Sequence, residues 1–254
     1  MTEFSFPPAP PEPVEPRSSL RVVLVLIAVA VLGAGAGGYG FGRMVLGYEA
    51  YAMQSENMSP TLAPGDRLVV RKADDAEVRR GDLVAIDLSA YAESSRDGVS
   101  VVRVVGVAGD TVACCTDEHL SVDGKPITEP YITPGYEGLF EFSAKVPEGA
   151  IFVEGDNRGN SDDSRFSGPV RLSGVIGVVV ATGTVVTPKP LAPVTAFTDA
   201  GLPGTPYSDG TLTGLRWWIL GGFVLFAGAV IGLIVTAVRS AGRRRRAAVA
   251  PPAR

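Results

Sequence analysis

The chain has 254 residues, a net charge of −4 and 46% hydrophobic residues. This length allows one core of ordinary size or two small ones. The middle of the chain, about 44–215, is acidic and argues against binding to nucleic acid, while the arginines at 243–246 are interpreted as a flank beside a membrane span.

The chain opens with a proline-rich tail, residues 1–21, that ends in Arg17 and Arg21. Residues 22–42 are then almost wholly Val, Leu, Ile, Ala and Gly. About 20 such residues cross the hydrocarbon core of a bilayer, and lipid requires a helix there. A cleavable signal peptide is the alternative. The long proline-rich tail and the lack of a persuasive cleavage site favour a permanent transmembrane helix.

Residues 43–185 show the pattern of a mostly β domain. Short apolar runs rich in β-branched residues alternate with turn signals that contain Gly, Asp and Pro, and no segment has a sustained helical period. The runs predicted as strands are 67–71, 83–86, 101–107 and 151–153. The pattern does not fix how these strands are arranged.

Residues 186–214 are rich in Pro, Thr, Ala and Gly and are predicted as a semi-extended tether. Residues 215–238 follow as a second predicted transmembrane helix, and residues 239–254 form an arginine-rich tail. Positive flanks lie before the first span and after the second. The positive-inside rule therefore predicts a plasma-membrane protein with two spans, both termini in the cytoplasm and the central domain outside.

Cys114 and Cys115 are adjacent, so a disulfide between them would close an eight-membered ring. The pair is interpreted as local and structural, with a functional role as the alternative. A structural zinc ion needs four ligands, and His119 is the only histidine. Neither a metal nor another cofactor is expected.

Two polar motifs stand out in the β-rich region. The first is Gln54-Ser55-Glu56-Asn57-Met58-Ser59-Pro60-Thr61-Leu62, and the second is Gly155-Asp156-Asn157-Arg158-Gly159-Asn160-Ser161-Asp162-Asp163-Ser164-Arg165. Between them lie Pro64-Gly65-Asp66 and the apolar segment Val101 to Asp110. These motifs resemble bacterial signal peptidase I, the S26 family of membrane-anchored Ser/Lys endopeptidases, in a form similar to those of high-GC Gram-positive bacteria.

The resemblance implies a Ser/Lys dyad, in which a lysine amine removes the proton of the serine hydroxyl. The family's nucleophilic serine falls at Asn57. Its lysine directly precedes the arginine of a Lys-Arg-x-Val-Gly pattern and falls at Val102, before Arg103. An amide nitrogen is not nucleophilic near neutral pH, and valine accepts no proton. Both dyad positions are therefore predicted to be non-catalytic.

Other positions of the family pattern are kept. Ser55 matches a serine that helps to stabilise the oxyanion, and Ser161 matches a serine that orients the lysine. Asp163 and Arg165 match a buried carboxylate–guanidinium pair. The resemblance also assigns support of the site from beneath to Asp156, Asn157 and Arg158. It assigns the floor of the groove to Met58, Pro60 and Leu62.

The sequence favours an inactive homologue of an enzyme family that cleaves signal peptides from exported pre-proteins. Such a protein would bind signal peptides or exported chains, or regulate an active paralogue. One alternative is an active serine endopeptidase whose nucleophile has shifted to Ser55 or Ser59, which requires a lysine or histidine within about 3 Å. The other is a purely structural membrane protein whose groove is filled by bulky side chains.

Overall fold

The computed structural model describes residues 17–72, 78–93, 96–116, 119–133, 135, 140–205 and 207–249. Most of the predicted N-terminal tail and residues 250–254 of the predicted C-terminal tail lie outside the described residues. The chain divides into two compact units. One comprises residues 42–215, and the other comprises residues 1–41 together with 216–254.

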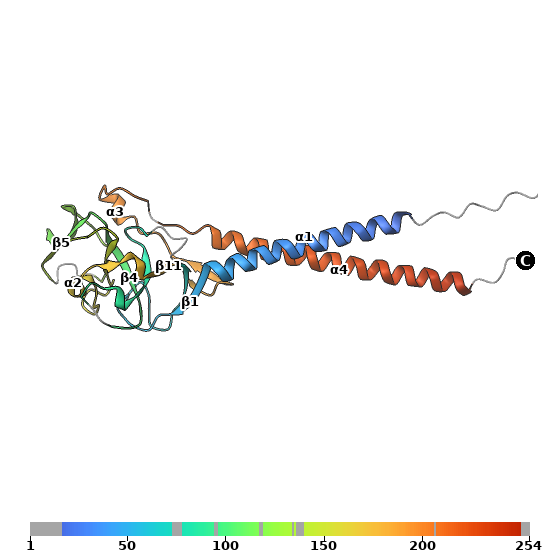
Figure 1. Cartoon of the computed structure of the whole chain (residues 1–254), viewed down its shortest axis with the longest axis horizontal. Helices are drawn as coiled ribbons and strands as arrows, with labels where there is room; N and C mark the ends of the chain where they lie inside the picture. The colour runs from blue at the N-terminus through green and yellow to red at the C-terminus, as the bar shows by residue number, and fades with distance from the viewer. Residues whose placement is uncertain are drawn as a thin grey trace, which may run out of the picture. The chain divides into compact units, whose positions relative to one another are not determined.

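The unit 42–215 is built on two antiparallel sheets (Figure 1). The strand order in the larger sheet is β1-β2-β11-β3-β4-β9-β10, with β12 paired to β11. The bounds are Tyr48–Ala52 for β1, Arg67–Lys72 for β2, Leu83–Asp87 for β3, Val99–Val107 for β4, Ala150–Glu154 for β9, Val170–Arg171 for β10, Val175–Gly183 for β11 and Pro188–Pro190 for β12. Each apolar run predicted as a strand falls on one of these strands, and the predicted mostly β fold is confirmed.

The smaller sheet has the order β7-β6-β5-β8. Its bounds are Thr111–Thr116 for β5, His119–Val122 for β6, Lys125–Pro126 for β7 and Phe142–Lys145 for β8. Two short helices, α2 (Ser164–Ser167) and α3 (Ala196–Asp199), complete the unit together with 3-10 turns at Leu88–Ala90 and Leu172–Gly174. Cys114 and Cys115 are joined by a disulfide on β5.

Two apolar clusters belong to the core of the described residues. The first lies under the loop that joins β1 to β2, and its members are Met53, Met58, Leu62, Leu68, Val70, Leu83, Ala85, Val101 and Val179. Met58 and Leu62 belong to this loop and are almost completely buried, so burial of their side chains fixes the loop on the sheet. The second cluster joins the smaller sheet to β9 and α3.

The segment 186–214 differs from the expected tether, because much of it packs against the β domain. Its strand β12 pairs with β11, and the side chains of Phe197 and Leu202 belong to the second apolar cluster. The guanidinium of Arg80 donates a hydrogen bond to the Pro203 carbonyl at 2.8 Å. The proline-rich composition predicted an extended chain, whereas burial of the two apolar side chains holds the segment in place.

The other unit contains most of α1 (Arg17–Gly47) and α4 (Thr211–Val249). Each helix carries an 18-residue apolar window long enough to cross a membrane, with a mean hydropathy of 2.3 for the window within Leu20–Gly47 and 2.5 for the window within Thr211–Arg243. Both helices extend beyond the predicted spans, because the flanking residues also form helix. The orientation of the two spans stays a prediction.

Within this unit α1 and α4 approach each other closely at glycines. A Cβ atom added to Gly33 would lie 2.6 Å from the backbone nitrogen of Phe226. One added to Gly222 would lie 2.3 Å from the backbone nitrogen of Gly37. Small residues at a helix interface allow this approach, which is common between helices in membranes.

Candidate active site

The loop between β1 and β2 carries Asn57 and is fastened to the second polar motif. The Asn57 carbonyl accepts a hydrogen bond from the backbone nitrogen of Asn157 at 2.9 Å. The Asn157 side chain donates from Nδ2 to the Glu56 carbonyl at 3.0 Å. Two segments far apart in the sequence thus meet at one site.

The Asn57 carboxamide is buried, with 8% of the residue exposed, and both of its ends are hydrogen-bonded. Its Oδ1 accepts from the Ser55 hydroxyl at 2.6 Å. Its Nδ2 donates to the Val101 carbonyl at 2.8 Å and lies 3.5 Å from the Ser100 hydroxyl. A neutral amide in these bonds offers no nucleophile and no base.

Val102, which the resemblance places at the position of the family's lysine, lies on β4 and is completely buried. The Ser161 hydroxyl is also buried and has no hydrogen-bond partner within the part of the chain that the structure describes. It lies close to the loop of Asn57, because a Cβ atom at Gly155 would be 2.3 Å from Ser161 Oγ and 2.5 Å from the Asn57 carbonyl oxygen. A buried hydroxyl is normally hydrogen-bonded, so Ser161 is a polar side chain of this site that the protein groups described leave unsatisfied.

Beneath this site Arg103 and Asp156 form a bidentate ion pair. Arg103 Nε and Nη2 donate to the two carboxylate oxygens at 2.7 and 2.6 Å, and both side chains are almost fully buried. Thr61 Oγ1 also donates to Asp156, at 2.5 Å, and the Arg103 guanidinium lies 4.0 Å from the centre of the Tyr131 ring. Burial alone would lower the pKa of Arg103, but the hydrogen bonds and charge of Asp156 raise it, so the guanidinium stays charged.

A second buried ion cluster is centred on Arg158. Its guanidinium contacts the Glu129 carboxylate at 2.5 and 3.0 Å and lies 2.8 Å from the Glu154 carboxylate. Tyr131 donates its hydroxyl to Glu129 at 2.6 Å. Glu154 has no hydrogen bond of good geometry, and burial raises its pKa to about 7 against the opposing charge of Arg158.

Asp163 and Arg165 form a third buried pair, with two hydrogen bonds of 2.8 Å between guanidinium and carboxylate. Asp163 also accepts from the backbone nitrogen of Gly155 at 2.9 Å and caps the N-terminus of α2. The pair therefore joins the strand end at β9 to the turn of the second motif. Its charges are neutralised where they are buried.

The residues expected at the groove floor divide into two groups. Met58 and Leu62 are buried in the first apolar cluster, whereas Pro60 is exposed. Ser55 and Ser59, the alternative nucleophiles, bond to Asn57 Oδ1 and to the Leu62 carbonyl. Among the described residues, neither hydroxyl is hydrogen-bonded to a lysine or a histidine.

The lysines of the chain have partners elsewhere or face solvent. Lys72 pairs with Glu49 at 3.3 Å, and the amines of Lys125 and Lys145 donate to backbone carbonyls at 2.5 Å. Lys189 is exposed on β12. None of these contacts brings an amine to Ser55 or Ser59.

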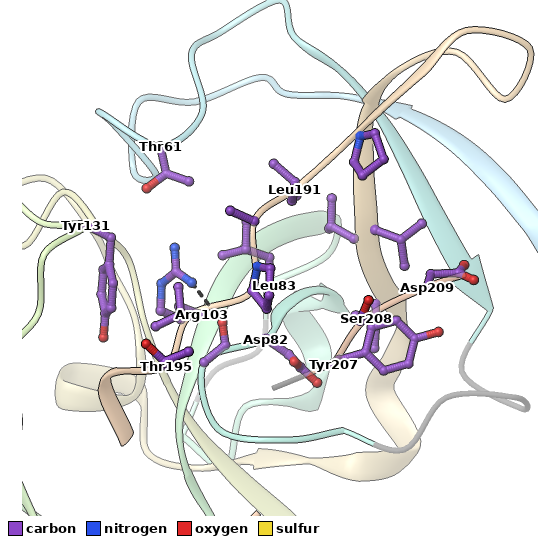
Figure 2. Close-up of a pocket in the computed structure, with 18 of the residues that line it drawn as sticks. Thr61, Asp82, Leu83, Arg103, Tyr131, Leu191, Thr195, Tyr207, Ser208 and Asp209 are labelled. Carbon is purple, nitrogen blue, oxygen red and sulfur yellow. Dashed lines mark hydrogen bonds between the residues drawn. The ribbon is translucent and has the colours of Figure 1, made fainter. Parts of the chain in front are cut away.

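A cavity of about 380 Å³ lies beside the Arg103 pair (Figure 2). Thr61, Leu83 and Arg103 line it from the sheet side, and residues 190–195 and 207–209 line it from the segment that leads to α4. Asp82 is buried in its wall, which raises the pKa of its carboxyl to about 6. Within the described residues, no group of three His, Cys, Asp or Glu side chains could hold a metal ion.

Sequence reasoning missed three partners of the supporting cluster. Glu129 and Glu154 pair with Arg158, and Tyr131 contacts both Arg103 and Glu129. The only signal for Glu129 and Tyr131 was the short sequence Glu129-Pro130-Tyr131. Glu154 is a charged residue that directly follows an apolar strand run, which is where a buried partner for a nearby arginine could have been sought.

Comparisons with known proteins agree with the motifs. Residues 20–183 match the sequence profile of the family described as "Signal peptidase, peptidase S26". The chain is 34% identical over 147 residues to signal peptidase I of Bacillus caldolyticus, which covers 52% of this chain and 77% of that protein. It is 38% identical over 129 residues to signal peptidase I of Bacillus licheniformis, and this match covers 46% of this chain and 66% of that protein. The crystal structure of a signal peptidase I from Enterococcus faecalis is similar with a TM-score of 0.36 and 28% identity, over 41% of this chain and 97% of that one.

Proposed function

This chain belongs to the signal peptidase family S26, and from that premise we propose that it is an inactive homologue. In this role it binds signal peptides or exported pre-proteins without cleaving them, or regulates an active paralogue. One observation carries the proposal: the two dyad-equivalent positions hold a hydrogen-bonded carboxamide at Asn57 and a buried valine at Val102. The relatives named signal peptidase I give the substrate class, namely exported chains that carry a signal peptide.

The chemistry of peptide cleavage explains why these two positions matter. A serine hydroxyl attacks a carbonyl only when a neighbouring base takes its proton, and in a Ser/Lys site that base is a neutral amine. Asn57 has no hydroxyl, and Val102 has no nitrogen. Loss of a triad-like nucleophile alone costs about 10⁴–10⁶ in rate, so the remaining groups leave little cleavage.

The unpaired Ser161 hydroxyl supports the same reading. The resemblance pairs the serine at this position with the family's lysine, which falls at Val102, and among the described residues the Ser161 hydroxyl has no partner. The supporting pairs Arg103–Asp156 and Asp163–Arg165 remain bidentate and buried. A framework preserved around a missing dyad is the pattern expected when selection maintains the shape of the site after its chemistry has been lost.

Two other functions have less support. A shifted nucleophile at Ser55 or Ser59 requires a base, and the hydrogen bonds of both hydroxyls go instead to Asn57 and Leu62. A purely structural role requires a groove filled by bulky side chains, whereas Ser55 and Pro60 beside Asn57 are exposed. We also propose that both termini lie in the cytoplasm and that the β domain lies outside the plasma membrane.

The test compares cleavage of a labelled pre-protein by the detergent-purified wild type and by the double variant Asn57→Ser/Val102→Lys. We expect no cleavage by the wild type and measurable cleavage after the Ala-x-Ala site by the double variant. The single variants serve as controls and should stay inactive, because each restores one half of the dyad. Cleavage by the wild type that is lost in Ser55→Ala or Ser59→Ala would overturn the proposal.

A further inference from the structure

Strand β4 has an open edge beside Asn57. On one side β4 pairs with β3, whereas on the other side β9 pairs with it only from Arg103 onward. In the part of the chain that the structure describes, no other strand pairs with that edge at Val99 or Val101. Val104 N donates to the Asp82 carbonyl on the β3 side at 2.9 Å. Because hydrogen-bonding directions alternate along a strand, the main-chain groups of Val99 and Val101 point to the open edge.

An open edge of this kind is an acceptor for an extended peptide, because a chain laid beside it completes a ladder of main-chain hydrogen bonds. The carbonyl of Val101 would accept from a backbone N–H of such a ligand. The hydroxyl of Ser55, on the facing loop and exposed, would donate to a ligand carbonyl. Together the two groups match the donor and the acceptor of one peptide group.

The side chain of Asn57 already fills both positions. Its Nδ2 donates to the Val101 carbonyl at 2.8 Å, and its Oδ1 accepts from the Ser55 hydroxyl at 2.6 Å. A carboxamide has the same donor and acceptor atoms as a backbone peptide group. The backbone of Asn57 is held in place by the bond from Asn157, so the side chain is aimed at these two groups by the loop itself.

We propose that the Asn57 carboxamide is an internal mimic of a ligand peptide group and closes the centre of the β4 edge in the unliganded protein. An extended segment of an exported chain docks on this edge only by displacing the carboxamide from Val101 and Ser55. The inference rests on the proposed function for the identity of the ligand. It adds that the residue at the former nucleophile position regulates how tightly a peptide binds.

The displacement of the Asn57 carboxamide determines how much peptide affinity changes when this side chain is removed. A peptide that replaces the carboxamide gains two hydrogen bonds and breaks two of the same kind, so it gains little at this point of the groove. Removal of the carboxamide leaves the same two groups free to bind the peptide. Two neutral hydrogen bonds, each of modest net strength, correspond to about a tenfold change in Kd.

The experiment measures fluorescence anisotropy of a dye-labelled peptide with an Ala-x-Ala site, titrated with full-length protein in detergent micelles. Asn57→Ala is expected to bind it about tenfold more tightly than the wild type. Asn57→Ser is the second variant and should also bind the peptide more tightly than the wild type, because its short hydroxyl cannot bridge the Val101 carbonyl and the Ser55 hydroxyl. Asn160→Ala is the matched control, since Asn160 is exposed on the neighbouring turn, and its Kd should equal that of the wild type.

Two further readouts separate this mechanism from a general loosening of the site. A peptide N-methylated at alternate backbone nitrogens cannot complete a ladder, so it should lose the gain produced by Asn57→Ala. In the wild type, saturating peptide should shift the side-chain amide NMR signals of Asn57, because its two hydrogen bonds are broken.

The outcomes distinguish the inference from the proposed function. Equal and measurable affinities of wild type and Asn57→Ala would overturn the inference and leave the binding role intact. Binding by Asn57→Ala with none by the wild type would support the inference and remove peptide binding as the role of the native chain. Absence of binding by every variant would overturn both.

Discussion

The site has two layers that differ in chemistry. The upper layer is the loop of Asn57 with Val102 and Ser161, and the lower layer is the set of buried ion pairs beneath it. In the upper layer, the two positions that the resemblance assigns to the dyad hold a carboxamide, Asn57, and a valine, Val102. Beneath it, three buried arginines keep carboxylate partners within 2.5–2.8 Å. The lower layer is also joined to the loop, because Thr61 Oγ1 donates to the Asp156 carboxylate. The proposed inactivity therefore concerns the upper layer alone, while the buried pairs of the lower layer hold the shape of the site.

The largest expected effect comes from breaking the lower layer. Arg103→Ala would leave the Asp156 carboxylate buried without a counter-charge, and loss of one partner of such a pair costs about 3–5 kcal/mol. This lowers the melting temperature of the detergent-purified protein by roughly 10 °C. The matched control is Arg96→Ala, whose ion pair with Asp162 is half exposed and should change stability by less than about 1 kcal/mol. Equal shifts in both variants would contradict the contrast between the two layers.

A smaller effect is expected at Glu154 and depends on pH. Burial raises the pKa of this carboxyl from 4.5 to about 7, so the folded state binds the proton more tightly than the unfolded state. The contribution of this carboxyl to the free energy of unfolding is therefore fully present below pH 4.5, where it is protonated in both states. The contribution is lost as the pH rises to about 7, because the unfolded state ionises first. Glu154→Gln cannot ionise and should match the wild type at low pH but exceed its stability at pH 8, by at most about 3 kcal/mol.

Thermal unfolding of the wild type and Glu154→Gln between pH 4.5 and 8 would check this difference. Asp82 also titrates in this window, since burial raises its pKa to about 6, and it contributes the same slope to both proteins. The comparison between the two curves removes that shared contribution. Parallel curves over the whole range would show that Glu154 is ionised in the folded protein at all these pH values.

The smallest effect is expected at the upper layer. Ser161→Ala removes a buried hydroxyl that has no partner, so it should leave stability unchanged or raise it by less than about 1 kcal/mol. The same substitution in a Val102→Lys background should be destabilising, because the introduced amine would then lose its partner. A double-mutant cycle of the two substitutions, measured by thermal unfolding, reports the coupling. A coupling of zero would mean that Ser161 does not face the side chain of residue 102.

The sequence predicts the fold well where the signal is local. Strand runs such as 83–86 and 101–107, and the apolar windows of both long helices, follow from periodicity and composition alone. The pairing of the strands does not follow, because β11 lies between β2 and β3 although it comes last among the long strands in the chain. Register and order depend on contacts that no single segment encodes.

The same limit applies at the site. Family motifs located Asn57, Val102 and the second polar motif, because each has its own short signature. The partners of Arg158 lie 29 and 4 residues away, and nothing in one sequence links Glu129 to that arginine rather than to another. The segment 186–214 was predicted as a tether because it is rich in proline, threonine, alanine and glycine, and this composition gives no sign that Phe197 and Leu202 are buried in the second apolar cluster.

Phe197 has a practical consequence for isolating the domain. The match to the family profile ends at residue 183, yet the core of this domain continues to Leu202. A soluble fragment cut at the end of the profile match would leave an apolar hollow between β9 and the smaller sheet. A fragment that ends after Asp209, where the carboxylate also accepts from the Tyr48 hydroxyl at 2.7 Å, keeps that hollow filled. For this protein, the packed domain extends beyond the end of the family match.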